Sequence, residues 1–226
     1  MDTATTPGVQ TIALDFVNAC VLETKDGRVL VDTGLPYTTD ALVAALEQTG
    51  GMPDLVILTH GHGDHVLGLG ALPGIPIAAH GTDADMLAEG RMARRMTPAP
   101  HCPDELREMV KGELPTGDPI EVSIRLTDGD TVPGFEDLTV VHTPGHSAGH
   151  IAILWDHAGG VMVVGDAAAN QGALMPAPVA EDHELNRESL RRLAGMDFEV
   201  AVFGHGETIT SGAGTAFAST WTPASA

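Results

Sequence analysis

The amino-acid sequence predicts an α/β protein in which short strands alternate with helices. Short apolar runs rich in β-branched residues are typical of buried strands, and residues 54–59, which follow Gly51 and Pro53, form such a run. Segments such as 39–49 and 184–194 instead place apolar residues at helical spacing. Several strand-like runs also end in histidine or aspartate beside glycine, which predicts a functional site at the strand ends.

The first third of the chain is predicted to open with a strand meander. Its strands are expected over residues 10–16, 19–24 and 28–32. A helix should then begin with Thr38 or Thr39 as its cap and end at Gly50-Gly51. After the strand at 54–59, we expect a short helix over 66–72 and a strand over 75–79, which Pro76 places at a sheet edge or a strand start.

Residues 82–119 form the least patterned stretch, and we expect this segment to cover a cleft. The pattern predicts a helix from Thr82 to about Met96, a proline-rich break over 98–103, and a second helix from Asp104 to about Lys111. Three arginines lie near the predicted end of the first helix: Arg91, Arg94 and Arg95. They fit either a solvated helix end or an anion-binding role, and the sequence leaves both interpretations open.

The pattern returns to strands from residue 120 onward. Strands are predicted over 120–126, 138–142, 150–155, 161–165 and 199–203. Asp182 is expected to cap a helix over 184–194. The Ala/Ser/Thr-rich tail, 212–226, is expected to fray unless Phe217 and Trp221 tether it.

Length and composition are those of one large domain over residues 1–226. The net charge of -20 disfavours nucleic acid as a partner. There is no apolar run of transmembrane length and no secretory pattern at the N-terminus, so we expect a soluble, cytoplasmic protein without a membrane partner. Cys20 and Cys102 carry no pairing signature. The sequence does not indicate an oligomeric state.

The hexapeptide His60-Gly61-His62-Gly63-Asp64-His65 follows the strand predicted over 54–59. Its three imidazoles and one carboxylate are spaced by glycines that let the backbone turn tightly, so the side chains can converge on divalent cations. The alternative is a histidine-rich surface loop. Three further strand ends argue against that alternative, because each places a ligand-type side chain beside glycine: His146, Asp166 and His205.

Together these residues resemble the metal-binding set of the metallo-β-lactamase superfamily, over about residues 10–210. The resemblance implies a four-layer αβ/βα sandwich of two mixed sheets flanked by helices, with two divalent metal ions at one edge. It further implies that His60, His62 and His146 hold the first ion, that Asp64, His65 and His205 hold the second, and that Asp166 bridges them. Zn²⁺ is the expected metal, although such ligands also accept iron or manganese.

Two residues next to this set have open roles. Asp32, in the sequence Val31-Asp32-Thr33-Gly34, occupies a place where the resemblance implies a residue supporting the metal ligands, and it fits equally well as a turn residue. His142 and His150 flank His146 at equal spacing, and we expect both to brace the loop rather than bind metal.

Two ions about 3.5 to 4 Å apart can activate a shared water as hydroxide, so the expected activity is hydrolysis of a small-molecule ester-like substrate, a thioester or a lactone. Asp64 is also expected to hydrogen-bond the attacking water. A bridging aspartate resembles the glyoxalase II-like and lactonase branches, but no tyrosine follows Asp166 as in acyl homoserine lactonases, and the chain is too short for the added domain of glyoxalase II.

Three alternatives remain open at this point. One is a persulfide dioxygenase of the same fold, with a single iron on His60, His146 and Asp166. The second is a β-lactam hydrolase. The third is a non-catalytic metal-binding protein, which a full set of seven ligand-type residues disfavours.

Overall fold

Strand β3 (Gly27–Val31) shows why the chain folds into layers. Its valines, Val29 and Val31, face one apolar cluster, whereas Leu30 between them faces another, and all three are buried. Side chains alternate across a strand, so three apolar side chains in succession require cover on both faces of the strand. The same division holds in the second half of the chain, where Val140 and Val141 belong to different clusters.

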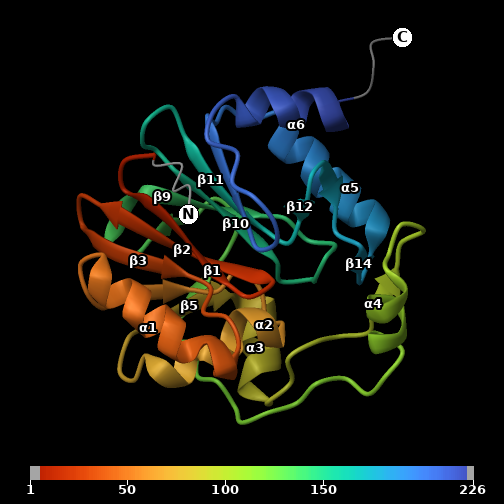
Figure 1. The fold of residues 1–226 in the computed structure, drawn as a ribbon, viewed down its shortest axis with the longest axis horizontal. Helices are drawn as coiled ribbons and strands as arrows, with labels where there is room; N and C mark the ends of the chain where they lie inside the picture. Colours follow the sequence, from red (N-terminus) through yellow and green to blue (C-terminus); the bar gives the residue numbers. More distant parts are fainter. Residues whose placement is uncertain (1–5, 223–226) are drawn as a thin grey trace.

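The computed structural model describes residues 6–222 and contains two mixed sheets packed face to face (Figure 1). The first has the order β1-β2-β3-β4-β5-β7, with β1 Val9–Leu14, β2 Val17–Thr24, β4 Leu55–Ile57, β5 Ile77–His80 and β7 Ile124–Leu126. The second has the order β15-β11-β10-β9-β8, with β8 Thr131–Val132, β9 Phe135–His142, β10 Ile151–Trp155, β11 Val161–Gly165 and β15 Val200–Phe203. Two small ribbons pair β12 (Ala168–Asn170) with β13 (Leu174–Pro176), and β14 (Val179–Ala180) with β6 (Thr97–Pro98).

Helices cover the outer face of each sheet and complete the predicted four-layer αβ/βα sandwich. The first sheet is covered by α1 (Thr39–Gln48), α2 (Gly63–Val66) and α3 (Gly81–Ala88), with the 3-10 turns Pro36–Thr38 and Leu67–Ala71. The second is covered by α5 (His183–Ala194) and α6 (Ala213–Trp221) (Figure 1). The short helix α4 (Asp104–Met109) belongs to the segment 82–119, which was predicted to cover a cleft. Among residues 6–222, no helix is long and apolar enough to cross a membrane.

The predicted helix from Thr82 to about Met96 is wrong in its second half. Helix α3 ends at Ala88 because Gly90 adopts a left-handed backbone conformation with φ of +70°, which glycine accepts without strain. The chain then runs in an extended path, and the amide of Gly117 donates to the carbonyl of Gly90. The three arginines, Arg91, Arg94 and Arg95, therefore lie beyond the helix.

Two smaller predictions also need correction, and a third is decided between its alternatives. The helix expected over 66–72 begins inside the hexapeptide, at Gly63, and continues as the 3-10 turn from Leu67. Of the two alternatives for Pro76, the strand start is confirmed, because β5 begins at the next residue, whereas the sheet edge is wrong, because β5 lies between β4 and β7. Thr38 occupies the N-cap position of α1, but its hydroxyl donates to the carbonyl of Leu35 instead of capping the helix.

The tail expected to fray is ordered as α6 over Ala213–Trp221, and only residues 223–226 of that tail lie outside the described part. Phe217 is fully buried, and its ring packs against Phe198, Phe203 and Trp221. The apolar side chains at helical spacing thus outweigh the low-complexity composition of this segment.

Replacing Phe217 with alanine should lower the free energy of unfolding by about 3 to 5 kcal/mol, because it opens a cavity in the cluster under α6. Urea denaturation followed by circular dichroism measures this change. Thr220→Ala alters an exposed position of the same helix and should change stability by less than about 0.5 kcal/mol. Equal, small effects of both variants would show that α6 is not part of the folded unit.

Candidate metal centre

The loop that follows β4 is held by the carboxylate of Asp32. The backbone amide and the hydroxyl of Thr59 donate to the two carboxylate oxygens of Asp32, each over 2.8 Å. Because the hydroxyl proton is used in this way, the Thr59 oxygen must accept from Nδ1–H of His60, over 3.0 Å. In the neutral form of His60, which its lowered pKa favours, Nε2 therefore carries a free lone pair.

His146 is oriented in the same way on the loop after β9. Its Nδ1–H donates to the carbonyl of Val179 over 3.0 Å, which leaves Nε2 unprotonated. Burial and the neighbouring His62 lower the pKa of His146 to about 3. Burial likewise lowers the pKa of His62 to about 4, and burial together with neighbouring imidazoles lowers the pKa of His60 well below its usual value. All three side chains are thus in the neutral form that binds metal.

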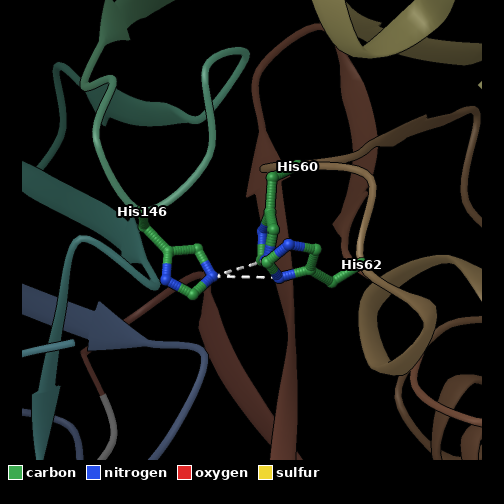
Figure 2. Close-up of side chains that lie close together, drawn as sticks. All are labelled: His60, His62 and His146. Atoms are coloured by element: carbon green, nitrogen blue, oxygen red, sulfur yellow. Dashed lines mark hydrogen bonds between the residues drawn. The ribbon is translucent and has the colours of Figure 1, made fainter. Parts of the chain in front are cut away.

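These three imidazoles point at one another (Figure 2). Nε2 of His146 lies 3.2 Å from Nε2 of His60 and 3.0 Å from Nδ1 of His62, and the latter two nitrogens are 2.9 Å apart. Two unprotonated nitrogens facing each other repel, so the contact between His60 and His146 gains nothing as a hydrogen bond. A cation shared by the three lone pairs would stabilise the arrangement.

A second group of ligand-type atoms is formed by Asp64, His65 and His205, which lie within 4.8 Å of one another. A carboxylate oxygen of Asp64 is 3.7 Å from Nε2 of His65 and 3.5 Å from Nε2 of His205. Each ring is oriented through Nδ1, the nitrogen that does not face Asp64. Nδ1 of His65 lies 2.8 Å from Asp32, and Nδ1–H of His205 donates to the carbonyl of Phe16. Asp32 therefore supports ligand-type residues of both groups.

Asp166 lies between the two groups. Its Oδ2 is 3.1 Å from Nε2 of His205, 3.5 Å from that of His65 and 3.6 Å from that of His146. Gly204 makes room for it, because a Cβ there would lie 2.0 Å from Oδ1 of Asp166. The geometry thus gives Asp166 contacts with both histidine groups.

Electrostatics at Asp166 also favour a cation. Burial raises the pKa of this carboxyl, but the positive charges of His205 and His65 outweigh that effect and hold the pKa well below its usual value. Burial lowers the pKa of His205, yet Asp166 raises it overall, to about 9, and the pKa of His65 is raised in the same way. Two protons therefore balance the buried negative charge, and bound divalent cations would replace them.

The described residues pass a test of fit for metal. Two polar atoms of the site, Nε2 of His65 and Oδ1 of Asp166, are buried and have no hydrogen-bond partner among residues 6–222. Buried polar groups are usually paired, and imidazole and carboxylate donors together suit zinc, iron or manganese. The seven side chains therefore fit two divalent cations.

The structure brings together all seven residues predicted from the sequence. Asp32 has the supporting role, because its carboxylate lies 2.8 Å from Nδ1 of His65, and its backbone adopts a φ of +61° directly after β3. His150 braces the loop as expected: its Nδ1–H donates to Thr143 and its Nε2 accepts the amide of Asp166. His142 donates to the carbonyl of Ala148.

Sequence reasoning missed the residues that orient the histidines, Thr59, Val179 and Phe16, and Phe16 is the exposed one. Its carbonyl orients His205, and its ring stacks on that imidazole at a centroid distance of 5.9 Å. Phe16 lies in an exposed hairpin turn that offered no signal in the sequence, because a backbone carbonyl acts irrespective of residue type.

A cavity of about 540 Å³ opens above the metal-binding groups. The segment predicted to cover a cleft lines much of it. Apolar side chains from this segment and from the opposite wall dominate the lining: Met92, Met96, Leu106, Met109, Val110, Leu114, Met175 and Phe16. His62, Asp64, His146, Asp166 and His205 form its polar floor. The arrangement would present a polar bond of a bound molecule to any cation held by these side chains.

Replacing Asp32 with asparagine should weaken Zn²⁺ binding about 10- to 100-fold, because it removes the charge that orients His65 and the Thr59–His60 pair. Competition with a chromophoric chelator measures this loss. Asp40→Asn changes an exposed aspartate on α1 and should leave the affinity unchanged. Unchanged affinity in Asp32→Asn would contradict the supporting role of Asp32.

Comparisons with known proteins agree with this geometry. The family model of the metallo-beta-lactamase superfamily matches residues 12–205. A probable metallo-hydrolase of Bacillus subtilis (strain 168) is 29% identical, over 80% of this chain and 76% of its own. An N-acyl homoserine lactonase of a Bacillus species is 27% identical, over 82% of this chain and 79% of its own.

A solved metallo-beta-lactamase from Cronobacter sakazakii superposes with a TM-score of 0.66, covering 88% of this chain and 75% of its own, at 20% identity. That likeness concerns the fold, and the sequence match and the ligand geometry add to it independently. The chain belongs to the metallo-beta-lactamase superfamily and is a metal-dependent hydrolase of that family.

Proposed function

We propose that this protein is a dinuclear zinc hydrolase that cleaves a small ester-like bond, a lactone or a thioester. The observation that carries the proposal is Asp166, placed between a three-histidine group and the group of Asp64, His65 and His205 at the floor of an apolar cavity. The likeness to an N-acyl homoserine lactonase supports the lactone among these substrates.

When bound, divalent cations supply a hydroxide nucleophile at neutral pH and polarise the scissile carbonyl. The protein's own residues prepare this chemistry. Burial keeps His60 and His146 neutral, and the bonds to Thr59 and Val179 fix their tautomers so that Nε2 of each ring is aimed at the first group. The carboxylate of Asp64 borders the cavity, and 25% of its side chain is exposed. It can therefore accept a hydrogen bond from the attacking water and orient that water. The covering segment restricts access of bulk water to the floor.

The composition of the cavity selects the kind of substrate. Arg94 is the one arginine or lysine among the described residues that line it, and its guanidinium already pairs with Asp83 at 2.7 Å and with Glu181 at 3.5 Å. A substrate carboxylate would therefore meet no free cation on these walls. The methionine-rich lining instead suits a neutral apolar group of variable shape, because methionine side chains adapt to irregular surfaces.

A persulfide dioxygenase with one iron on His60, His146 and Asp166 is the second candidate. It is disfavoured because Asp64, His65 and His205 are assembled beside that set and would have no function in a mononuclear site. Iron at one equivalent per chain, with oxygen uptake on a persulfide, would favour this candidate over the proposed one.

The proposed function is tested by elemental analysis together with assays on a thioester, a lactone and a β-lactam. We expect about two zinc ions per chain and turnover of the thioester or the lactone. His62→Ala and Asp166→Ala should each lose bound metal and reduce kcat at least about 100-fold, since each removes a ligand-type side chain. His157→Ala, a histidine that stacks on Trp155 away from the centre, is the matched control. Hydrolysis that survives in His62→Ala with unchanged metal content would refute the mechanism.

Substrate selection gives a separate prediction. In a series of acyl chains from two to ten carbons, kcat/KM should rise with chain length, and a chain ending in a carboxylate should be a poor substrate. Met109→Asp places a charge at the rim of the cavity and should raise KM for long chains about tenfold, with little effect on the shortest. Met52→Asp also changes an exposed methionine but lies outside the cavity, so its KM should not move.

A further inference from the structure

A second buried carboxylate, Asp83 on α3, lies outside the seven ligand-type residues and is fully buried. It accepts three hydrogen bonds from three different segments. Oδ2 accepts from the amide of Gly61 over 2.9 Å and from the hydroxyl of Ser147 over 3.1 Å. Oδ1 accepts from Nη1 of Arg94 over 2.7 Å. Burying a charge is costly, so the role of Asp83 should follow from the segments to which its three donors belong.

Two of these donors belong to the loops of the three-histidine group. Gly61 lies between His60 and His62, and Ser147 directly follows His146. The first loop extends from the first sheet and the second from the other sheet, so the Asp83 carboxylate joins them across the sandwich. Gly149 permits this approach, because a Cβ at that position would lie 2.5 Å from the carboxylate. The spacing of the histidines is thereby tied to one side chain.

The third donor, Arg94, comes from the covering segment. Its guanidinium also donates to the carbonyl of Thr82 over 2.9 Å and reaches Glu181 at 3.5 Å. Glu181 in turn accepts the amide of Ala148 and donates its own amide to the carbonyl of His146. Arg94 therefore supplies the positive charge that balances Asp83. It connects the covering segment to the His146 loop through two carboxylates, Asp83 and Glu181.

We propose that Asp83 is a positioning residue of the metal centre and that Arg94 is its counter-ion rather than a binder of anionic substrate. One ion pair, between buried Asp83 and partly exposed Arg94, then sets both the separation of His60, His62 and His146 and the path of the covering segment over the cavity. This inference rests on the metal centre proposed above. It explains why Arg94, and neither Arg91 nor Arg95, bonds to a buried carboxylate.

The test compares Asp83→Asn and Arg94→Met with Arg95→Met. Arg95 belongs to the same segment but makes one long contact, to the carbonyl of Gly112 at 3.5 Å, so it is the matched control. Chelator competition should show Zn²⁺ binding about 10- to 100-fold weaker in Asp83→Asn and Arg94→Met and unchanged in Arg95→Met. Arg94→Lys keeps the charge and should recover part of the affinity.

A second measurement uses the metal-free protein. Hydrogen exchange of peptides covering 59–65 and 145–150 should be faster in Asp83→Asn and Arg94→Met than in the wild type, because the bonds of the two loops are weakened. Phe217→Ala, destabilised at a distant helix, should leave Zn²⁺ affinity unchanged. This control separates positioning of the ligands from a general loss of stability.

Each outcome decides the inference. Equal Zn²⁺ affinity and equal exchange in Asp83→Asn, Arg94→Met and Arg95→Met would overturn it while leaving the proposed function intact. An equal loss of affinity in Phe217→Ala would also overturn it, since the effect would then be general. If the wild type bound no Zn²⁺, the proposed function would fail. The exchange data would still show whether Asp83 holds the loops of residues 59–65 and 145–150.

Discussion

The centre depends on one electrostatic constraint, the buried carboxylate of Asp166 facing imidazoles from both groups. A carboxylate removed from water must be balanced by positive charge nearby. In this chain the balance falls on His65 and His205, whose pKa values Asp166 raises. The three-histidine group on the other side is neutral and aimed at a common point. Cations held between these groups would satisfy both requirements at once.

That constraint also explains the use of two sheets. The ligand-type residues follow β4, β9, β11 and β15, so they meet only if the sheets keep their relative position. Direct backbone bonds join the halves at this edge: the amide of Ile151 donates to Thr59 over 2.8 Å, and that of Asn18 to Gly204 over 2.7 Å. The apolar core between the sheets supplies the rigidity. The position of the centre is thus a consequence of sheet packing, and polar side chains refine it.

Much of this was predictable because the signals are local. Short apolar runs ending in ligand-type residues beside glycine identify the strands and the site, as at His60 and His205. The end of α3 was missed because a single glycine, Gly90, outweighs a helical composition that continues to Met96. The pairing of Arg94 with Asp83 could not be predicted, because it requires the chain to reverse after Gly90 and Glu181 to arrive from a distant segment. The order of α6 depends on Phe217 packing against residues remote in sequence.

The cavity divides its tasks between a rigid floor and adaptable walls. His146 and His205 of the floor are oriented by the backbone carbonyls of Val179 and Phe16, and Asp32 orients His65 behind the floor. The walls are largely methionine and leucine from a segment without long regular structure, and such side chains accept ligands of several shapes. Substitutions in the walls should therefore change which substrate is bound, whereas substitutions behind the floor should change metal affinity. Arg94 is the exception, because it lines the wall of the cavity and also bonds to Asp83, the carboxylate proposed to position the three histidines. Metal binding and the shape of the substrate cavity are consequently coupled through this one residue.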